Sequence, residues 1–283
     1  MSRPLRLVAA VLSIVLSAST AWSAGDPERG EYLLHAGGCA GCHTVKDGPA
    51  LAGGVALASP VGTFHVPNIT PDPETGIGGW SEDDFVRAMS LGIAPDGTPY
   101  YPAFPYPFYT HMAREDVLDL KAYLDTVEPV RNAVRDHGLT FPFSVRGGLH
   151  LWQAAFFAPG PLLPVEGQSD AWERGRYLVN GPGHCGACHT PMSWYVSWDS
   201  DGFLAGTRSG PDGKPVPSIA PTEDGIGDWS PGDVVLALQT GFLPDGDVLG
   251  GLMSEVVRNT GKLSQDDLQA IAAYLLDADA PRP

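Results

Sequence analysis

Two short stretches decide how this 283-residue chain folds: Cys39-Ala-Gly-Cys42-His43 and Cys185-Gly-Ala-Cys188-His189. Together they use all four cysteines of the chain, and a histidine follows each pair directly. Four cysteines in an exported chain could form two disulfides, and paired C-x-x-C motifs can also bind zinc. Neither alternative explains why a histidine comes immediately after both pairs.

C-x-x-C-H is the signature of covalent haem attachment. Two thiols three positions apart add to the two vinyl groups of one porphyrin, and the adjacent imidazole reaches the iron from the same side. The sequence therefore predicts two covalently bound haem c groups. The residues expected to attach them are Cys39, Cys42, Cys185 and Cys188, with His43 and His189 as iron ligands.

The sequence around the two motifs is repeated, which indicates that each motif belongs to its own unit. Residues 29–34 (RGEYLL) before the first motif match residues 174–179 (RGRYLV) before the second. Further along, residues 76–80 (GIGGW) match residues 225–229 (GIGDW). The length of the chain also favours two domains, at roughly 100 to 200 residues each.

Helix boundaries recur at matching places in the two units. A serine followed by acidic or proline residues predicts a helix start at Ser81 and at Ser230. A glycine ends each of these helices, at Gly92 and Gly241. The last helix of each unit is amphipathic; its apolar positions are Val117, Leu120 and Leu124 in the first unit and Leu268, Ile271 and Leu275 in the second. These patterns predict an all-α fold.

This order of helices resembles class I cytochromes c, whose final helix ends in Ala-Tyr-Leu, as residues 122–124 and 273–275 do. Residues 68–72 (NITPD), 76–80 (GIGGW) and 101–106 (YPAFPY) are similar to the multi-haem cytochrome subunits of bacterial membrane-bound alcohol, aldehyde and sugar-acid dehydrogenases. We therefore expect two tandem class I cytochrome c domains, each wrapping one covalently attached haem. Their expected bounds are residues 24–130 and 171–283, joined by an apolar, proline-rich connector of residues 131–170.

The sixth iron ligands are less regular than the motifs. Met253 follows a glycine-rich loop at the place where class I cytochromes carry their ligand, so we expect it to bind the second iron. Phe104 stands where related subunits often carry methionine, and phenylalanine cannot ligate iron. Met112 is the nearest replacement, although it could instead pack on the last helix as a core residue. His111 or His65 could also ligate the first iron.

The resemblance also implies three residues at the porphyrin rim. Asn68, Trp80 and Trp229 could hydrogen-bond haem propionates, as in the resembled family. The alternative for the two tryptophans is that they fill the core, and a buried indole often does both.

The amino terminus has the pattern of a secretory signal. Arg3 and Arg6 precede an apolar run over residues 7–16, and small residues then favour cleavage after Ser23. An uncleaved anchor is the alternative, but the run is shorter than the roughly 20 residues that span a bilayer. We expect a signal peptide over residues 1–23 and a periplasmic protein, free or associated with the outer face of the inner membrane, with no transmembrane span in the mature chain.

The net charge of −16 argues against nucleic acid as a partner, because phosphate binding needs clustered lysine and arginine. An acidic chain suits a basic redox partner. We expect electron transfer between a dehydrogenase donor and a cytochrome or oxidase acceptor of the respiratory chain. The alternative is a haem enzyme that uses an open or labile sixth site on the first haem for peroxide or sulfur-compound chemistry. No second catalytic constellation is evident in the sequence, which favours electron transfer.

Overall fold

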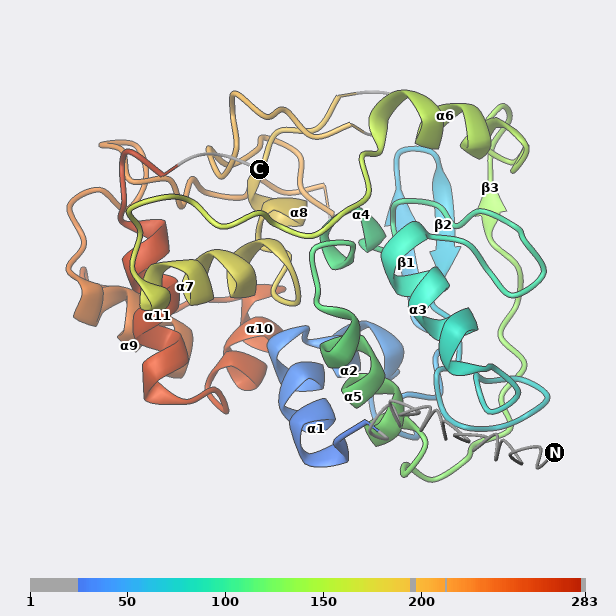
Figure 1. Ribbon diagram of the computed structural model, residues 1–283. Helices are drawn as coiled ribbons and strands as arrows, with labels where there is room; N and C mark the ends of the chain where they lie inside the picture. Colours follow the sequence, from blue (N-terminus) through green and yellow to red (C-terminus); the bar gives the residue numbers. More distant parts are fainter. Residues whose placement is uncertain (1–24, 194–196, 212, 281–283) are drawn as a thin grey trace, which may run out of the picture.

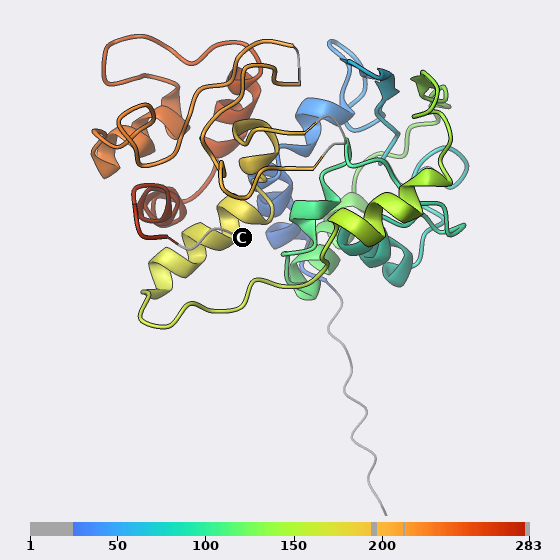
Figure 2. The same cartoon turned by 90° about the horizontal axis from the view of Figure 1, so that it is seen from above.

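The structure is a computed structural model that describes residues 25–193, 197–211 and 213–280. The expected signal peptide, residues 1–23, lies outside these ranges. Two groups of helices lie side by side in both views (Figures 1 and 2). We call residues 25–130 the first half, residues 131–169 the connector and residues 170–280 the second half. Over the described ranges, no helix has the length and apolar character needed to cross a membrane.

The helices of the two halves follow the same order around their motifs. The first half contains α1 (Pro27–Ala36), α2 (Cys39–His43), α3 (Glu82–Leu91), α4 (Tyr106–Tyr109) and α5 (Arg114–Leu124). The second half contains α7 (Asp170–Asn180), α8 (Gly186–His189), α9 (Pro231–Thr240), α10 (Met253–Thr260) and α11 (Gln265–Leu275). The first and last helices of each half pack on one another, α1 on α5 and α7 on α11.

The predicted boundaries of α3 and α9 are confirmed. Ser81 and Ser230 each form a capping box, in which the serine side chain accepts from the third helical residue and that residue's carboxylate bonds back. Gly92 and Gly241 end the two helices with φ angles of +64° and +84°, a left-handed conformation that glycine adopts without a steric penalty.

A glycine lies at the crossing of the first and last helices in each half. A Cβ atom added at Gly30 would lie 2.0 Å from the carbonyl oxygen of Asp119 in α5. One added at Gly175 would lie 1.8 Å from the carbonyl oxygen of Ala270 in α11. The absence of a side chain at these two positions therefore lets the helix backbones touch.

The expectation of an all-α fold missed a small antiparallel sheet. Strand β1 (Ala56–Ser59) pairs with β2 (Gly62–His65), and β2 pairs with β3 (Gly138–Leu139). Four-residue strands are too short for an alternating pattern to stand out, and β3 comes from the connector. The fold is therefore mostly helical with one three-stranded sheet.

The connector packs mainly on the first half. Its helix α6 (Gly148–Phe156) lies along the outside of that half in Figure 1. The Gln153 side chain donates to the carbonyl of Leu91 (3.1 Å), and the Phe157 ring packs edge-on against Tyr106 (5.0 Å). The phenol of Tyr101 donates to the carbonyl of Phe143 (2.6 Å). Large apolar side chains nonetheless stay exposed along the connector, at Phe141, Val145, Leu151, Phe156 and Leu163.

Each half has its own hydrophobic core, and some residues of the first half also belong to the core of the second. Phe108 of α4 and Ala36 of α1 belong to the core of the second half, not the first. The Phe108 ring packs edge-on against Trp198 at a centroid distance of 5.1 Å. Apolar contact thus joins the halves through the segment between α3 and α5.

Candidate functional site

The two C-x-x-C-H motifs form one helical turn each. In α2, Cys39, Cys42 and His43 stand at positions i, i+3 and i+4, which share one face of a helix. Cys185 immediately precedes α8, so the second motif repeats this spacing. None of the four cysteines, all of them in the described part of the chain, is in a disulfide. Each motif thus presents two thiols and one imidazole together.

The histidine of each motif is oriented by a proline carbonyl further along the chain. Nδ1 of His43 donates to the carbonyl of Pro67, and Nδ1 of His189 donates to the carbonyl of Pro217, both at 2.8 Å. A carbonyl can only accept, so the proton is on Nδ1 and the lone pair is on Nε2. In metal-binding histidines generally, a hydrogen bond of this kind fixes the tautomer and the orientation of the ring.

A glycine lets the proline segment approach each motif. The amide of Gly53 donates to the carbonyl of His43, and that of Gly206 donates to the carbonyl of His189, both at 2.7 Å. Both glycines have positive φ angles, +72° and +76°. A Cβ atom would lie 2.4 Å from the carbonyl carbon of Pro67 at the first and 2.7 Å from that of Pro217 at the second. Side chains at these positions would therefore push the histidine's acceptor away.

A leucine in an unusual conformation recurs between each motif and its proline. Leu51 and Leu204 have φ angles of +60° and +62°, which are uncommon for residues with a side chain. Their amides donate to the hydroxyls of Thr44 (3.0 Å) and Thr190 (3.1 Å), the residues that follow the two histidines. Both leucines are buried. The two sites therefore have the same backbone conformation here, including the positive φ angle at the leucine.

Desolvation decides the protonation of both motifs. Burial lowers the pKa of His43 to about 4 and also lowers the pKa of His189, so both imidazoles are neutral at pH 7. Burial raises the pKa of Cys39 and of Cys185 to about 12, so these thiols stay protonated. A neutral imidazole with a fixed Nε2 lone pair, beside two thiols on the same helical face, fits a covalently attached haem.

Asn68 is buried and fully engaged within the protein. Its amide nitrogen donates to the carbonyl of Val130 (2.7 Å) and to the hydroxyl of Thr75 (3.1 Å). Its oxygen accepts from the backbone and the hydroxyl of Thr70 (2.9 and 2.8 Å). These bonds give Asn68 a role in ordering the segment after Pro67. Its bonding to a haem propionate stays a prediction.

Trp80 and Trp229 are half-buried and pack against the cores of the first and second halves. Each lies one residue before the serine that caps α3 or α9. This position fits the core-filling alternative, and hydrogen bonding to a propionate stays a prediction for both.

Met253 and Phe104 occupy matching places in the two halves. Each follows the glycine that ends the middle helix, Gly241 or Gly92, at the same spacing. Met253 is half-buried and is the first residue of α10, a helix that the sequence analysis did not predict. Phe104 instead lies among aromatic rings, with Tyr109 at 5.6 Å. The first half therefore has no donor atom at the place of Met253.

The other candidates for the first iron are spread over the first half. Met112 is buried in the same core cluster as Val117 of the last helix, α5. This placement fits the alternative that Met112 packs on that helix as a core residue. His111 donates from Nδ1 to the carbonyl of Gly160 in the connector (2.9 Å), and His65 ends β2. Ligation by Met112, His111 or His65 stays a prediction.

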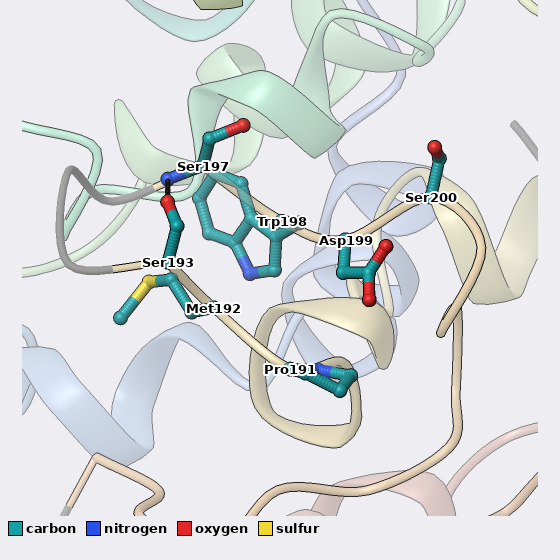
Figure 3. A pocket seen from close by; sticks show the side chains of 7 residues that line it. All are labelled: Pro191, Met192, Ser193, Ser197, Trp198, Asp199 and Ser200. Carbon is teal, nitrogen blue, oxygen red and sulfur yellow. Dashed lines mark hydrogen bonds between the residues drawn. The ribbon is translucent and has the colours of Figure 1, made fainter.

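The loop after the second motif encloses a shallow hollow (Figure 3). It lies between Pro191 and Ser200, and the amide of Ser197 donates to the hydroxyl of Ser193 across it (3.0 Å). Pro191, which lies two residues after His189, lines this hollow and a neighbouring one. The hollows lie beside the chain that leaves the second motif.

The structure brings the two motifs close together through residues that the sequence analysis did not select. The buried ring of Tyr109 in α4 packs edge-on against His184, which directly precedes Cys185, at a centroid distance of 5.4 Å. A Cβ atom added at Gly37 would lie 3.3 Å from the Cys39 sulfur and 3.5 Å from the carbonyl oxygen of Pro182. In the sequence, only the internal repeat indicates the prolines that orient the two histidines and the glycines beside them. No local pattern indicates the contact between Tyr109 and His184.

Comparison with known proteins adds three findings. The family described as Cytochrome c matches residues 27–128. The "Diheme cytochrome c-type" protein of Cereibacter sphaeroides is 46% identical over 258 residues, covering 89% of this chain and 85% of the relative. The "Gluconate 2-dehydrogenase cytochrome c subunit" of Pantoea cypripedii is 40% identical over 281 residues, covering 96% of this chain and 64% of the relative.

A second dehydrogenase subunit is also similar. The "Alcohol dehydrogenase (quinone), cytochrome c subunit" of Gluconobacter oxydans is 38% identical over 258 residues, which is 88% of this chain and 54% of the relative. This chain therefore spans most of the dihaem relative, but only between about half and two thirds of the two dehydrogenase subunits.

Proposed function

This chain belongs to the cytochrome c family, and on that basis we propose that it binds two haem c groups covalently and passes electrons between a dehydrogenase and the respiratory chain. A six-coordinate haem c supplies reversible one-electron exchange when bound. The protein contributes the attachment thiols and the orientation of the imidazoles.

The observation that carries the proposal is the identical geometry of the two motifs. Each histidine donates from Nδ1 to a proline carbonyl at 2.8 Å and keeps Nε2 for a metal, with two thiols beside it. Such matched geometry at two places supports two equivalent sites. The name of the dihaem relative supports the same number.

We assign one tandem domain to residues 24–130 and the other to residues 171–283, with residues 131–170 as the connector. Met253 is the proposed sixth ligand of the second iron, since it follows the Gly250-Gly251 turn at the start of α10. Met112 is the proposed ligand of the first iron, with His111 and His65 as alternatives.

The proposed partners are a dehydrogenase as electron donor and a cytochrome or oxidase as acceptor. The names of two relatives, cytochrome c subunits of gluconate and alcohol dehydrogenases, support the donor class. The proposed location is the periplasm, reached through the signal peptide of residues 1–23. The alternative of a peroxide or sulfur-compound enzyme finds no support among these relatives.

Mass spectrometry of the exported chain tests the central proposal. The expected mass is that of residues 24–283 plus two haems. Reduction of the purified protein with dithionite, followed by carbon monoxide, then tests the coordination. Absence of carbon monoxide binding at both irons is expected of an electron carrier. One haem or none per chain would refute the proposal. Rapid carbon monoxide binding at the first iron would refute Met112 as its ligand, and rapid binding at the second iron would refute Met253.

A further inference from the structure

A tyrosine of each half reaches across to the last helix of the other half. The phenol of Tyr32, on α1, donates to Oδ2 of Asp267 on α11 at 2.6 Å. The phenol of Tyr177, on α7, donates to Oδ2 of Asp116 on α5. The two hydrogen bonds run in opposite directions between the halves, and each joins residues that are far apart in the chain.

Each phenol also accepts a hydrogen bond from the start of the helix that it reaches. The backbone N–H of Ser264, the residue before α11, donates to the oxygen of Tyr32 at 3.1 Å. The backbone N–H of Ala113, the residue before α5, donates to the oxygen of Tyr177 at 3.2 Å. These amides are among the first N–H groups of their helices, which have no hydrogen-bond acceptor within the helix. A side chain from the opposite half therefore helps to cap both terminal helices.

The two aspartates are in turn held by an arginine of their own half. Arg174 on α7 contacts both oxygens of Asp267, with Nε to Oδ1 at 2.8 Å and the second nitrogen to Oδ2 at 2.7 Å. Arg29 on α1 contacts Asp116, with Nε to Oδ1 at 2.9 Å. A carboxylate held this way is a fixed acceptor, and hydrogen bonds to a charged acceptor are stronger than neutral ones.

The residues of these two clusters match one another in the internal repeat. Arg29 and Tyr32 of RGEYLL correspond to Arg174 and Tyr177 of RGRYLV. Asp116 and Asp267 are each the third residue of the last helix of their half. The interface is therefore close to two-fold symmetric, as expected of an isologous contact in which the same residues serve on both sides.

This interface adjoins the contact between the two motifs. Tyr32 lies on α1, whose end leads into Cys39, and Tyr177 lies on α7, whose end leads into Cys185. The Tyr109 and His184 rings, at 5.4 Å, join the halves between the same two motifs. A rotation about the interface would change the distance between the motifs directly.

From this arrangement we propose that Tyr32 and Tyr177 are positioning residues that hold the two halves in one relative orientation and so set the rate of electron passage between the two haems. The second part of this proposal, the rate of electron passage, rests on the proposed function, whereas the first part, the orientation of the halves, does not. Burial raises the pKa of both phenols, so both remain hydrogen-bond donors at neutral pH. Since electron tunnelling falls steeply with distance, an orientation held by one tyrosine from each half keeps the passage rate uniform.

The test compares Tyr32→Phe, Tyr177→Phe and the double variant with Tyr123→Phe in the full, haem-loaded protein. Tyr123 is the matched control, because its phenol bonds to Glu31 within the same half. Removing a hydrogen bond to a carboxylate should shift the equilibrium between closed and open arrangements about tenfold for each tyrosine. Amide exchange should therefore accelerate about tenfold at Ser264 in Tyr177→Phe and at Ala113 in Tyr32→Phe, because each of these amides keeps its own phenol acceptor in that variant.

Two further readouts distinguish positioning from simple stabilisation. In the double variant, the rate of electron passage between the haems after flash reduction should fall and the haem–haem signal in Soret circular dichroism should weaken. The haem content and the absorption spectrum of each haem should not change. The Tyr123→Phe control should match the unsubstituted protein in all readouts.

An unchanged passage rate and Soret signal in a double variant with two haems would overturn the proposal. If the double variant does not fold, the single variants decide the question by the same readouts. If the unsubstituted protein carries fewer than two haems, the proposed function fails. Amide exchange at Ala113 in Tyr32→Phe and at Ser264 in Tyr177→Phe then still tests whether the tyrosines hold the halves together, and unchanged exchange there would refute that part.

Discussion

The close crossing of α7 and α11 leads to a sharp prediction for Gly175→Ala. The new Cβ atom would lie 1.8 Å from the carbonyl oxygen of Ala270 and 2.4 Å from its carbonyl carbon. Both are backbone atoms, so no side-chain rotation relieves the contact. The helices would have to part by roughly 1.5 Å to restore ordinary van der Waals distance, and closely packed interiors resist such shifts.

The expected cost follows from two opposing effects. Overpacking of this kind costs about 3 kcal/mol when the backbone must move. Replacing a helical glycine by alanine returns about 1 kcal/mol of helix propensity. The net loss of about 2 kcal/mol should lower the unfolding midpoint of the haem-loaded protein by about 4 to 8 °C for a cooperative unit of 150 to 250 residues.

Thermal unfolding followed by far-ultraviolet circular dichroism measures this change. Gly232→Ala is the matched control, because Gly232 is exposed in the first turn of α9 and its nearest neighbour would be the Ser230 hydroxyl at 3.6 Å. That variant should be as stable as the unsubstituted protein or slightly more stable. Gly30→Ala should behave like Gly175→Ala, since its Cβ would meet Asp119 at 2.0 Å. Equal midpoints for Gly175→Ala and Gly232→Ala would refute the reasoning.

Three further predictions concern the sites and the interface. Met253→Ala should abolish the sulfur-to-iron charge-transfer band of the second haem while both porphyrins stay attached; an unchanged near-infrared spectrum would contradict this ligand. Cys39→Ala and Cys188→Ala should each cost one covalent haem, and a mass equal to that of the two-haem protein would contradict the attachment. Burial alone would raise the pKa of Asp267, but the hydrogen bonds of Arg174 and Tyr32 lower it below its ordinary value. Stability from this carboxylate is therefore present above about pH 4, the unfolded pKa, and is lost as the pH falls through the lower folded pKa. Urea titrations between pH 6 and pH 3 should show a smaller loss for Asp267→Asn than for the unsubstituted protein, and equal losses would contradict the linkage.

Features set by neighbouring residues were predictable. The boundaries of α3 and α9 follow from a serine, an aspartate three residues later and a glycine at the far end, so the capping boxes at Ser81 and Ser230 could be read locally. The internal repeat identifies the matching segments of the two halves from the sequence alone. Strands β1 and β2 were missed because four residues are too few for an alternating pattern, and β3 was missed because it pairs with β2 across more than seventy residues of chain.

The candidate sites were predictable only in part. The thiols and imidazoles of each motif are adjacent in sequence, and their chemistry is recognisable from residue type alone. The carbonyl that orients His43 belongs to Pro67, and nothing around Pro67 indicates that a histidine points at it. Asn68 was selected by resemblance, whereas the structure shows its hydrogen bonds used by Thr70, Thr75 and the distant carbonyl of Val130.

The helix ends and the two C-x-x-C-H motifs could be predicted because each depends on residues a few positions apart, and the repeat could be predicted because whole segments of the sequence recur. The tertiary structure alone decided how the halves meet. Tyr32 and Asp267 are 235 residues apart, and Tyr177 and Asp116 are 61 apart. Their pairing depends on how the helix pair α1 and α5 packs against the pair α7 and α11, and no local sequence pattern encodes that packing.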